Sequence, residues 1–399
     1  MKSLWRYGLA AATMCVTAPV AAQGRIELPV SLGELEKRAA ADSNDPIAHY
    51  NLALGYWNAK RWDDVESSLR TSLTLEPRLA LSRLALSRLV FVRRPRLTEE
   101  LFESSTVPRD VREALQTADR EWRHAFMIDP TVDLKIIAAS YSAGADQWLI
   151  RDVLGEVWSN YFQATIDCYE GRYESCEQRF NRVVEDFRDA GPRSVIPNGV
   201  YFLRGLAASR TGNFEQAIRD FRMLIGREEE RKEELEEKDL VRIPLQINEY
   251  RYFVAAFTHA AGRTGEAIRL YREAVTNDLG LYMGHVRLAA IHEVARDFPK
   301  AIEERRRALN ANPDDATLHL DLGITLGKSG DFAGAEEAIQ VTTERIPRHV
   351  EAWYWLGVAR EQQGKREAAQ AAYQRVVELA PSRLAARADA ARAKVASLQ

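Results

Sequence analysis

The chain has 399 residues, of which 46% are hydrophobic and 28% are charged, and its formal net charge at pH 7 is −3. This length allows two or three ordinary domains or one elongated repeat array, and the hydrophobic fraction is enough to bury a core. The small negative charge gives no electrostatic basis for binding nucleic acid, so we expect no nucleic-acid partner. Gly and Pro number only 22 and 14, and runs of β-branched residues are scarce. The composition therefore predicts an almost purely α-helical protein.

The first residues are typical of an export signal. Lys2 and Arg6 precede a short apolar stretch that ends in Val-Ala-Ala at residues 20–22, the pattern that a signal peptidase recognises. The stretch is shorter than the roughly 20 residues that a membrane-spanning helix needs. We expect residues 1–22 to be removed, which leaves a chain that begins at Gln23, has no membrane span and carries a formal charge of −5, because two cations leave a net charge of −3. Its expected location is the periplasm, with secretion as the alternative.

Residues 23–92 form the predicted N-terminal repeats and hold the first example of a unit that recurs along the chain. The segment "AHYNLALGYWNAKRWDDVESSLRTSLTLEP", which closes at Pro77, predicts two helices joined by a short turn. Proline cannot continue a helix, so each unit ends where the next can begin. The segment "LALSRLALSRLVFV" follows, and we interpret it as the first helix of another unit.

Residues 93–155 interrupt the pattern. An insertion over about residues 93–111 separates that helix from its expected partner, "REALQTADREWRHAFMIDP", so we interpret this unit as split. The stretch 131–155 fits no position of the repeat and is the segment most specific to this protein. A rival hypothesis therefore places an enzyme or small-ligand site in residues 92–155. Its first candidate residues are Ser140, Tyr141, Ser142, Asp146 and Trp148.

Residues 156–280 contain three degenerate copies of the unit, of which "YFLRGLAASRTGNFEQAIRDF" is one. A segment at 227–238, "REEERKEELEEK", is charged at every residue except Leu235. It predicts a helical extension into solvent, with Glu228 and Lys232 as one favourable i,i+4 pair. The alternative is an arm that docks a partner.

Residues 281–381 contain three regular units. Pro313, Pro347 and Pro381 are spaced 34 residues apart, and each closes a segment of the same pattern. Gly330 and Gly364 lie between the two helices of their units, where glycine allows a tight turn. The final residues, 382–399, predict a C-terminal capping helix, because the end of a stacked array needs a polar cover.

This pattern resembles the tetratricopeptide-repeat family, whose unit is a helix-turn-helix of 34 residues. The resemblance is strong from about Leu281 onward and weak between Pro130 and Trp158, where the spacing breaks. It implies an all-α, right-handed α-solenoid of stacked repeats that acts as a non-enzymatic scaffold for protein partners. Small residues such as Gly357 and Ala369 are then expected where the paired helices cross, since large ones would force the helices apart.

The resemblance also implies where a partner binds, because the first helix of each unit lines a concave groove in this family. The position that follows Trp353 is aromatic in five of the seven recognisable units. We therefore expect an apolar and aromatic groove for a peptide or protein partner, although rings at this position could instead pack against neighbouring helices. The Lys, Asn and Arg that carboxylate-binding members use are absent there. The expected groove residues are Tyr50, Tyr161, Phe202, Tyr252, Val286, Leu320, Ile324, Tyr354 and Val358.

Two cysteines remain after removal of the signal, Cys168 and Cys176. In one continuous helix, eight residues would separate them by about 12 Å, which is beyond bonding reach. A helical hairpin that turns at Gly171 could bring them together, so a disulfide is possible in an oxidising compartment. The alternative is that Cys176 is a buried thiol in the position of a small residue. Cys15 is a poor lipoprotein attachment site, because Met14 stands where that motif needs a small residue.

No segment carries a convincing catalytic, cofactor or metal motif. The stretch "GITLGKSG" has three residues between Gly323 and Gly327 where a phosphate-binding loop needs four, and no strand precedes it. His49, His285 and His319 occupy the position of Trp353, which indicates packing rather than metal ligation. We therefore expect no catalytic residue, no cofactor and no metal, and a scaffold that acts, as a further hypothesis, in assembly of the cell envelope.

Overall fold

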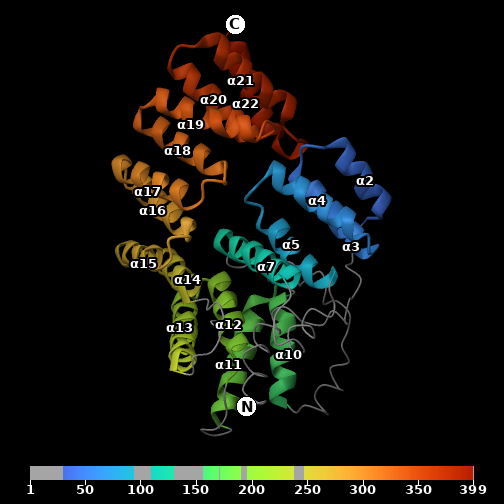
Figure 1. The fold of residues 1–399 in the computed structure, drawn as a ribbon, viewed down its shortest axis with the longest axis vertical. Coiled ribbons are helices and arrows are strands. Elements are labelled where there is room, and N and C mark those ends of the chain that lie inside the picture. The colour runs from blue at the N-terminus through green and yellow to red at the C-terminus, as the bar shows by residue number, and fades with distance from the viewer. Residues whose placement is uncertain are drawn as a thin grey trace. The chain divides into compact units, whose positions relative to one another are not determined.

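The computed structural model describes residues 30–93, 109–129, 156–169, 171–189, 196–237 and 247–398. These residues form eighteen α-helices and one 3-10 helix, and none of them lies in a strand. The helices divide into two compact units (Figure 1). The described part of unit 1 lies within residues 83–270, whereas unit 2 combines residues 30–82 with residues 271–399. The all-α prediction is confirmed.

The helices of unit 1 come from the middle of the chain, and α5 and α15 cross the boundaries between the units. These helices are α5 (Ala80–Arg93), α7 (Arg109–Ile128), α10 (Glu156–Tyr169), α11 (Tyr173–Asp189), α12 (Asn198–Thr211), α13 (Phe214–Glu237), α14 (Ile247–Ala260) and α15 (Thr264–Asn277). The helices that lie wholly in unit 2 are α2 (Leu32–Ala41), α3 (Pro46–Asn58), α4 (Trp62–Leu75), α16 (Tyr282–Val294), α17 (Phe298–Ala311), α18 (Thr317–Ser329), α19 (Phe332–Arg345), α20 (Val350–Gln362), α21 (Arg366–Leu379) and α22 (Ala385–Ser397), with the 3-10 helix η1 (Ser382–Leu384).

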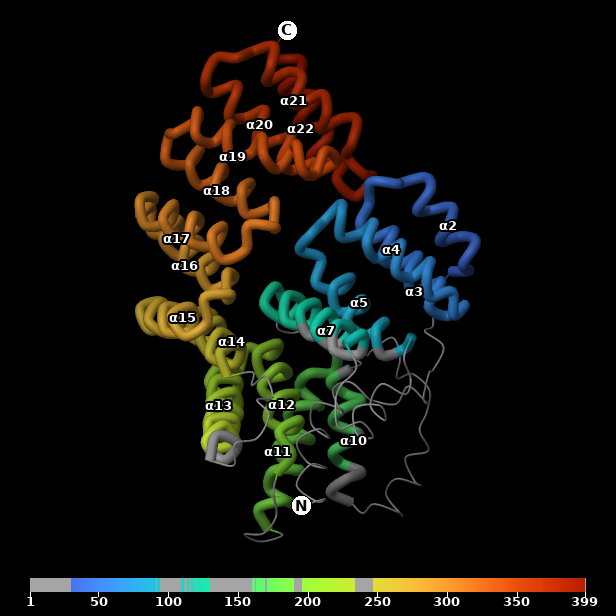
Figure 2. Tube along the Cα trace, viewed as in Figure 1, coloured from blue at the N-terminus to red at the C-terminus, as the bar shows by residue number. Residues whose placement is uncertain are grey.

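Helices that follow one another in the chain pack as pairs, and each pair packs on the next. In unit 2, α16 packs on α17, α18 on α19 and α20 on α21, and α17–α18 and α19–α20 contacts join successive pairs. The trace in Figure 2 shows this succession for the orange and red part of the chain. The predicted solenoid of helix-turn-helix repeats is therefore confirmed. Among the described helices, none has the length and apolar character to cross a membrane.

The turn inside each regular repeat is built by one residue with a positive φ. Gly330 (φ 94°) and Gly364 (φ 74°) fill this place as the sequence predicts. In two units without a glycine there, Arg296 (φ 57°) and Lys60 (φ 58°) adopt the same left-handed conformation. A non-glycine residue rarely adopts it, so the packing of the two flanking helices must hold it. After the turn, Asp331 caps α19 by accepting a hydrogen bond from the Gly334 amide at 2.9 Å.

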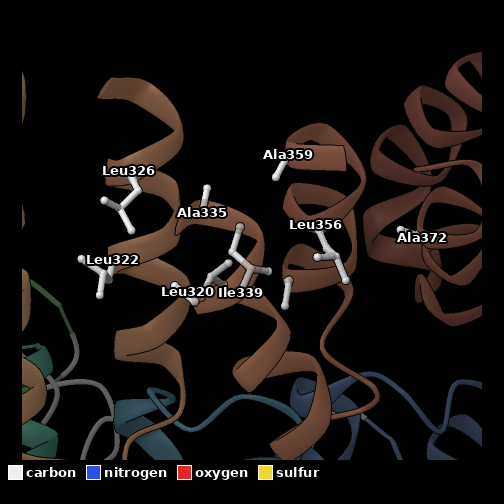
Figure 3. Close-up of a cluster of buried hydrophobic side chains, with 10 residues drawn as sticks. Leu320, Leu322, Leu326, Ala335, Ile339, Leu356, Ala359 and Ala372 are labelled. Carbon is white, nitrogen blue, oxygen red and sulfur yellow. The ribbon is translucent and has the colours of Figure 1, made fainter. Parts of the chain in front are cut away.

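The hydrophobic core of the regular repeats runs from one repeat into the next. Figure 3 shows one cluster, in which Leu322 and Leu326 of α18 face Ala335 and Ile339 of α19, and Leu356 of α20 packs against the same group. All of these side chains are at most 9% exposed. Because one cluster uses helices of two successive repeats, neither repeat buries its apolar face alone.

In two of the regular repeats, the paired helices approach closely at a glycine. A methyl group on Gly323 would overlap the Ile339 side chain and lie 3.0 Å from the backbone oxygen of Ala335. A methyl group on Gly357 would lie 2.7 Å from the Tyr373 ring. The expectation that small residues permit a close crossing is confirmed, although the nearest neighbour of Gly357 is the Tyr373 ring rather than Ala369.

The charged segment at 227–238 continues α13, whose described part ends at Glu237. Its first turn does not project freely into solvent. The Arg227 guanidinium lies over the Tyr201 ring at 4.7 Å and donates to the Ile196 carbonyl oxygen at 2.6 Å. Glu228 is 8% exposed, and burial raises the pKa of its carboxyl. The prediction of a solvated extension is therefore wrong for this first turn, because Arg227 contacts Tyr201 and Ile196 and Glu228 is buried.

The two glycines of α18 make a matched pair of substitutions. Gly323→Ala should lower the free energy of unfolding by about 1–3 kcal/mol, because the new methyl overpacks the crossing with α19. Gly327→Ala should raise it by up to about 1 kcal/mol, because alanine favours a helix over glycine. At Gly327 a methyl would meet only the Ala335 side chain, at an ordinary 3.7 Å. Urea unfolding followed by circular dichroism measures the free energy of unfolding of each variant. Equal changes in the two variants would contradict the packing argument.

Candidate partner-binding surface

Five of the nine expected groove residues are buried inside the protein. Tyr252 is 0% exposed, and the other four are between 5% and 8% exposed. A side chain without accessible surface cannot contact a partner, so the prediction is wrong for these five positions. They are Tyr50, Tyr161, Phe202, Tyr252 and Leu320.

Helix α7 explains the burial of two of these residues in unit 1. The Tyr252 hydroxyl donates to the Met127 carbonyl oxygen of α7 at 2.8 Å. The Phe202 ring packs against Phe126 of α7 at a centroid distance of 5.8 Å and against Phe221 at 5.7 Å. Helix α7 thus covers Phe202 and Tyr252, two residues that the sequence assigns to the groove. The broken repeat spacing before residue 156 was the one sequence signal that this part of the array departs from regular stacking.

The other four expected groove residues keep part of their surface exposed, and all lie in the first helices of the regular repeats. Val286 belongs to α16, Ile324 to α18, and Tyr354 and Val358 to α20. Each is intermediate in exposure rather than buried. This set, which we call the first-helix surface, is the part of the expected groove that the structure leaves accessible.

Tyr354, one member of this surface, also has contacts inside the protein. Its ring packs edge-on against Trp355 at 6.0 Å and against Tyr373 at 5.7 Å. The Arg387 guanidinium of α22 lies over the ring at 4.2 Å. The C-terminal capping helix therefore uses one side of Tyr354, and only the remaining part of the ring is open to a partner.

The carboxylate of Glu293 ties α16 to its partner helix α17 and to the next repeat. Glu293 of α16 accepts from Arg305 at 2.9 Å and from Lys328 at 2.7 Å, and it also binds the Thr325 hydroxyl. Burial alone would raise the pKa of Glu293, but the hydrogen bonds from Lys328, Thr325 and Arg305 outweigh it and lower the pKa. The carboxylate stays ionised at neutral pH with its oxygens already engaged, which suits a structural link rather than proton transfer.

A second polar cluster in unit 2 joins residues far apart in the chain. Arg78, in the loop after α4, donates to Asp315 at 3.2 Å and to Asp321 of α18 at 2.7 Å. Burial alone would lower the pKa of Arg78, but Asp321 and Asp315 more than compensate and raise it. Sequence reasoning missed this site, because its partners lie 237 and 243 residues from Arg78 and no local pattern marks them.

Two of the histidines, and the stretch that contains Gly323 and Gly327, have structural roles. His285 Nδ1 lies 2.7 Å from a Glu304 carboxylate oxygen. His49 Nε2 lies 3.1 Å from the Ser43 carbonyl oxygen. Gly323 and Gly327 are both inside α18, so no phosphate-binding loop forms there. The described residues contain no cluster of three or more His, Cys, Asp or Glu that could hold a metal ion.

The residues proposed for the rival enzyme or ligand site fall outside the part of the chain that the structure describes. They are Ser140, Tyr141, Ser142, Asp146 and Trp148.

Cys168 and Cys176 form a disulfide that closes the α10–α11 hairpin. Their Cα atoms are 5.0 Å apart, and both residues are 0% exposed. The chain turns at Gly171, which has a φ of 78°. Asp167, beside the bond, accepts from Ser175 at 2.6 Å and from Arg179 at 2.8 Å, so the hairpin is also held by polar contacts.

Reduction of this disulfide should lower the free energy of unfolding by about 2.5 kcal/mol, the loop-closure entropy expected for a loop of roughly eight residues. Urea unfolding with and without a reductant measures the difference. A double variant, Cys168→Ala with Cys176→Ala, is the control and should unfold identically under both conditions. A wild-type protein that is insensitive to reductant would show that the bond contributes nothing to stability.

Comparison with known proteins agrees with this repeat architecture. Residues 320–383 match the family model described as tetratricopeptide repeat. Human protein O-mannosyl-transferase TMTC1 is 26% identical over 137 residues, which are 33% of this chain and 16% of that protein. The chain thus spans about one sixth of the length of this curated relative.

Two solved structures are similar at low identity. MamA from Desulfovibrio magneticus RS-1, residue 41 to the end, is 18% identical, with a TM-score of 0.36 over 46% of this chain and 94% of that one. The C-terminal part of a TPR repeat-containing protein from Cytophaga hutchinsonii is 15% identical, with a TM-score of 0.44 over 61% of this chain and 95% of that one. The match over residues 320–383, together with the helix pairs that recur there every 34 residues, identifies tetratricopeptide repeats in this part of the chain.

Proposed function

We propose that the chain is a non-enzymatic scaffold that binds a protein or peptide partner on the first-helix surface of the regular repeats. Proteins of this family generally serve as protein-protein interaction scaffolds. The observation that carries the proposal is that Val286, Ile324 and Val358 each keep part of their surface exposed, on three successive first helices. Such a stripe can accept an extended segment or a helix by apolar burial, with Tyr354 adding a hydroxyl group.

The polar groups near this surface favour binding over catalysis. A general acid or base needs a carboxyl or imidazole group that is free to exchange a proton with a substrate. Glu293 is held by Arg305 and Lys328, and Asp321 accepts from both Arg78 and Arg305. These carboxylates are committed to links between helices, so they are poor candidates for a reacting group.

We further propose that the protein acts outside the cytoplasm, in assembly of the cell envelope. Two features support export. The first is the signal-like pattern of residues 1–22. The second is the disulfide between Cys168 and Cys176, because such bonds form and persist in oxidising compartments.

A photo-crosslinking amino acid at position 324 tests the binding surface. In native envelope extracts, the variant at Ile324 should crosslink to a discrete partner, because this side chain is partly exposed on α18. The matched control places the same amino acid at Gln340, which is exposed on α19, the second helix of the same repeat. Equal crosslinking at both positions, or none at 324, would contradict the proposal.

Once the crosslinked partner is purified, charge substitution on the surface should weaken its binding. Ile324→Glu should lower the affinity about tenfold or more, because it places a charge where apolar surface is buried on binding. Gln340→Glu is the matched control and should bind like the wild type. Calorimetry or surface plasmon resonance measures the affinities, and circular dichroism checks that both variants remain folded.

Export is tested separately, by identifying the first residue of the protein recovered from its native cells. Mass spectrometry of the chain recovered from the periplasm should find Gln23 as the first residue, because the small residues before it complete the cleavage pattern. The proposal of export fails if the protein is found only inside the cell with residues 1–22 attached.

A further inference from the structure

The N-terminal hairpin of unit 2, residues 30–82, contacts the regular repeats through one end. Helices α3 and α4 pack as a pair, so the loop before α3 and the loop after α4 lie at the same end. The loop after α4 supplies Arg78, and the loop before α3 supplies residues 42–45. Residues of these two loops form hydrogen bonds and ion pairs with the regular repeats and with η1.

The first contact is the insertion of the Arg78 side chain between two carboxylates. Its Nη1 lies 2.7 Å from Asp321 and its Nε lies 3.2 Å from Asp315, in a site where the arginine side chain is 19% exposed. The guanidinium group presents several donors in a rigid plane, and this geometry suits two acceptors better than a lysine would. Asp315 and Asp321 together, which we call the acidic site, therefore recognise an arginine.

The second contact is a set of hydrogen bonds between the 42–45 loop and the C-terminal end of unit 2. Asp42 accepts from the Ser382 backbone N–H at 3.0 Å and from its hydroxyl at 2.8 Å. Asp45 accepts from Arg383 at 2.5 Å. Arg348 donates to the Ser43 hydroxyl at 3.0 Å. Most of these groups are exposed, so water can replace them at little cost.

The attachment of the hairpin includes several polar contacts, and one buried donor in it has no acceptor. The two apolar clusters of α18–α22 include no residue from 30–82. Within the described part of the chain, Nη2 of Arg78 is buried without a hydrogen-bond partner. A buried donor without an acceptor costs free energy and offsets part of the gain from the ion pairs. The hairpin is therefore held by contacts that a competing ligand can replace.

The acidic site is arranged independently of Arg78. Asp315 accepts from the Thr317 backbone N–H at 3.0 Å and from its hydroxyl at 2.5 Å, which holds the carboxylate at the start of α18. Asp321 also accepts from Arg305 at 3.3 Å. Both carboxylates would keep their positions if Arg78 withdrew, so the site would be ready for another guanidinium group.

We propose that the acidic site binds an arginine side chain of an extended partner segment, and that Arg78 fills this site when no partner is bound. This inference rests on the proposed scaffold function and adds the chemistry of the partner. The chain's own segment, Glu-Pro-Arg-Leu at residues 76–79, shows what the site accepts. A partner must compete with a tethered arginine, whose effective concentration is high, so the hairpin selects against weak or transient ligands.

A synthetic peptide with the sequence of residues 74–82, TLEPRLALS, tests the acidic site on the full chain. The Arg78→Ala protein should bind this peptide roughly tenfold more tightly than the wild type, because the tethered competitor is gone. The matched control is Arg70→Ala, which removes an exposed arginine of α4 that pairs with Glu66 of the same helix. The control should bind the peptide as weakly as the wild type does. NMR titration or calorimetry measures the affinities.

Two further arms establish that the site itself is responsible. A peptide in which alanine replaces the arginine should not bind any variant, and Asp321→Asn in the Arg78→Ala background should abolish binding of the original peptide. Hydrogen exchange at Ser382, whose amide donates to Asp42, should speed up in Arg78→Ala and remain unchanged in Arg70→Ala. The proposal is overturned if Arg78→Ala and wild type bind the peptide equally, if none binds it, or if Ser382 exchange is unaffected.

These results are separable from the scaffold test. If a partner crosslinks at position 324 but Arg78→Ala does not change peptide binding, the scaffold proposal is supported and only the proposal for the acidic site is overturned. If peptide binding depends on Arg78 and Asp321 but no partner crosslinks at position 324, the proposal for the acidic site is supported. The proposal that partners bind on the first-helix surface is then overturned.

Discussion

Each helix pair in this protein needs its neighbour to complete its core, and this requirement organises the rest of the structure. Ile339 shows it directly, because it packs against α18 in its own repeat and lies in one cluster with Leu356 of the next. Such a core forms only if the paired helices approach closely, which Gly323 and Gly357 allow. The array is therefore a series of shared interfaces, and the loss of one crossing is felt by two repeats.

Charged residues serve the same stacking. Glu293 reaches Lys328 of the next repeat, and Glu361 reaches Lys394 of the capping helix. Pairs of this kind join neighbouring helix pairs, although each contributes only modestly because its lysine is partly solvated. Glu293 and Glu361 thus serve as links between neighbouring helices of the array.

The aromatic stripe shows why equivalent positions in a repeat do not share one environment. Tyr354 and Tyr252 hold the same place in their units, yet Tyr354 is partly exposed and Tyr252 is completely buried. The difference comes from α7, which packs over α12 and α14 in unit 1 with Phe126 and Met127. A repeat pattern predicts which side of a helix a residue occupies, but it does not predict what covers that side.

The sequence by itself determined the helix-turn-helix units, their glycine turns and close crossings, and the hairpin that lets Cys168 meet Cys176. These features depend on residues fewer than about 34 positions apart, so a periodic pattern records them. Only the tertiary structure decided that Tyr252 is buried, and that Arg78 lies between Asp315 and Asp321. Those contacts join parts of the chain far apart in sequence, and they depend on the path of the whole array, which no local pattern specifies.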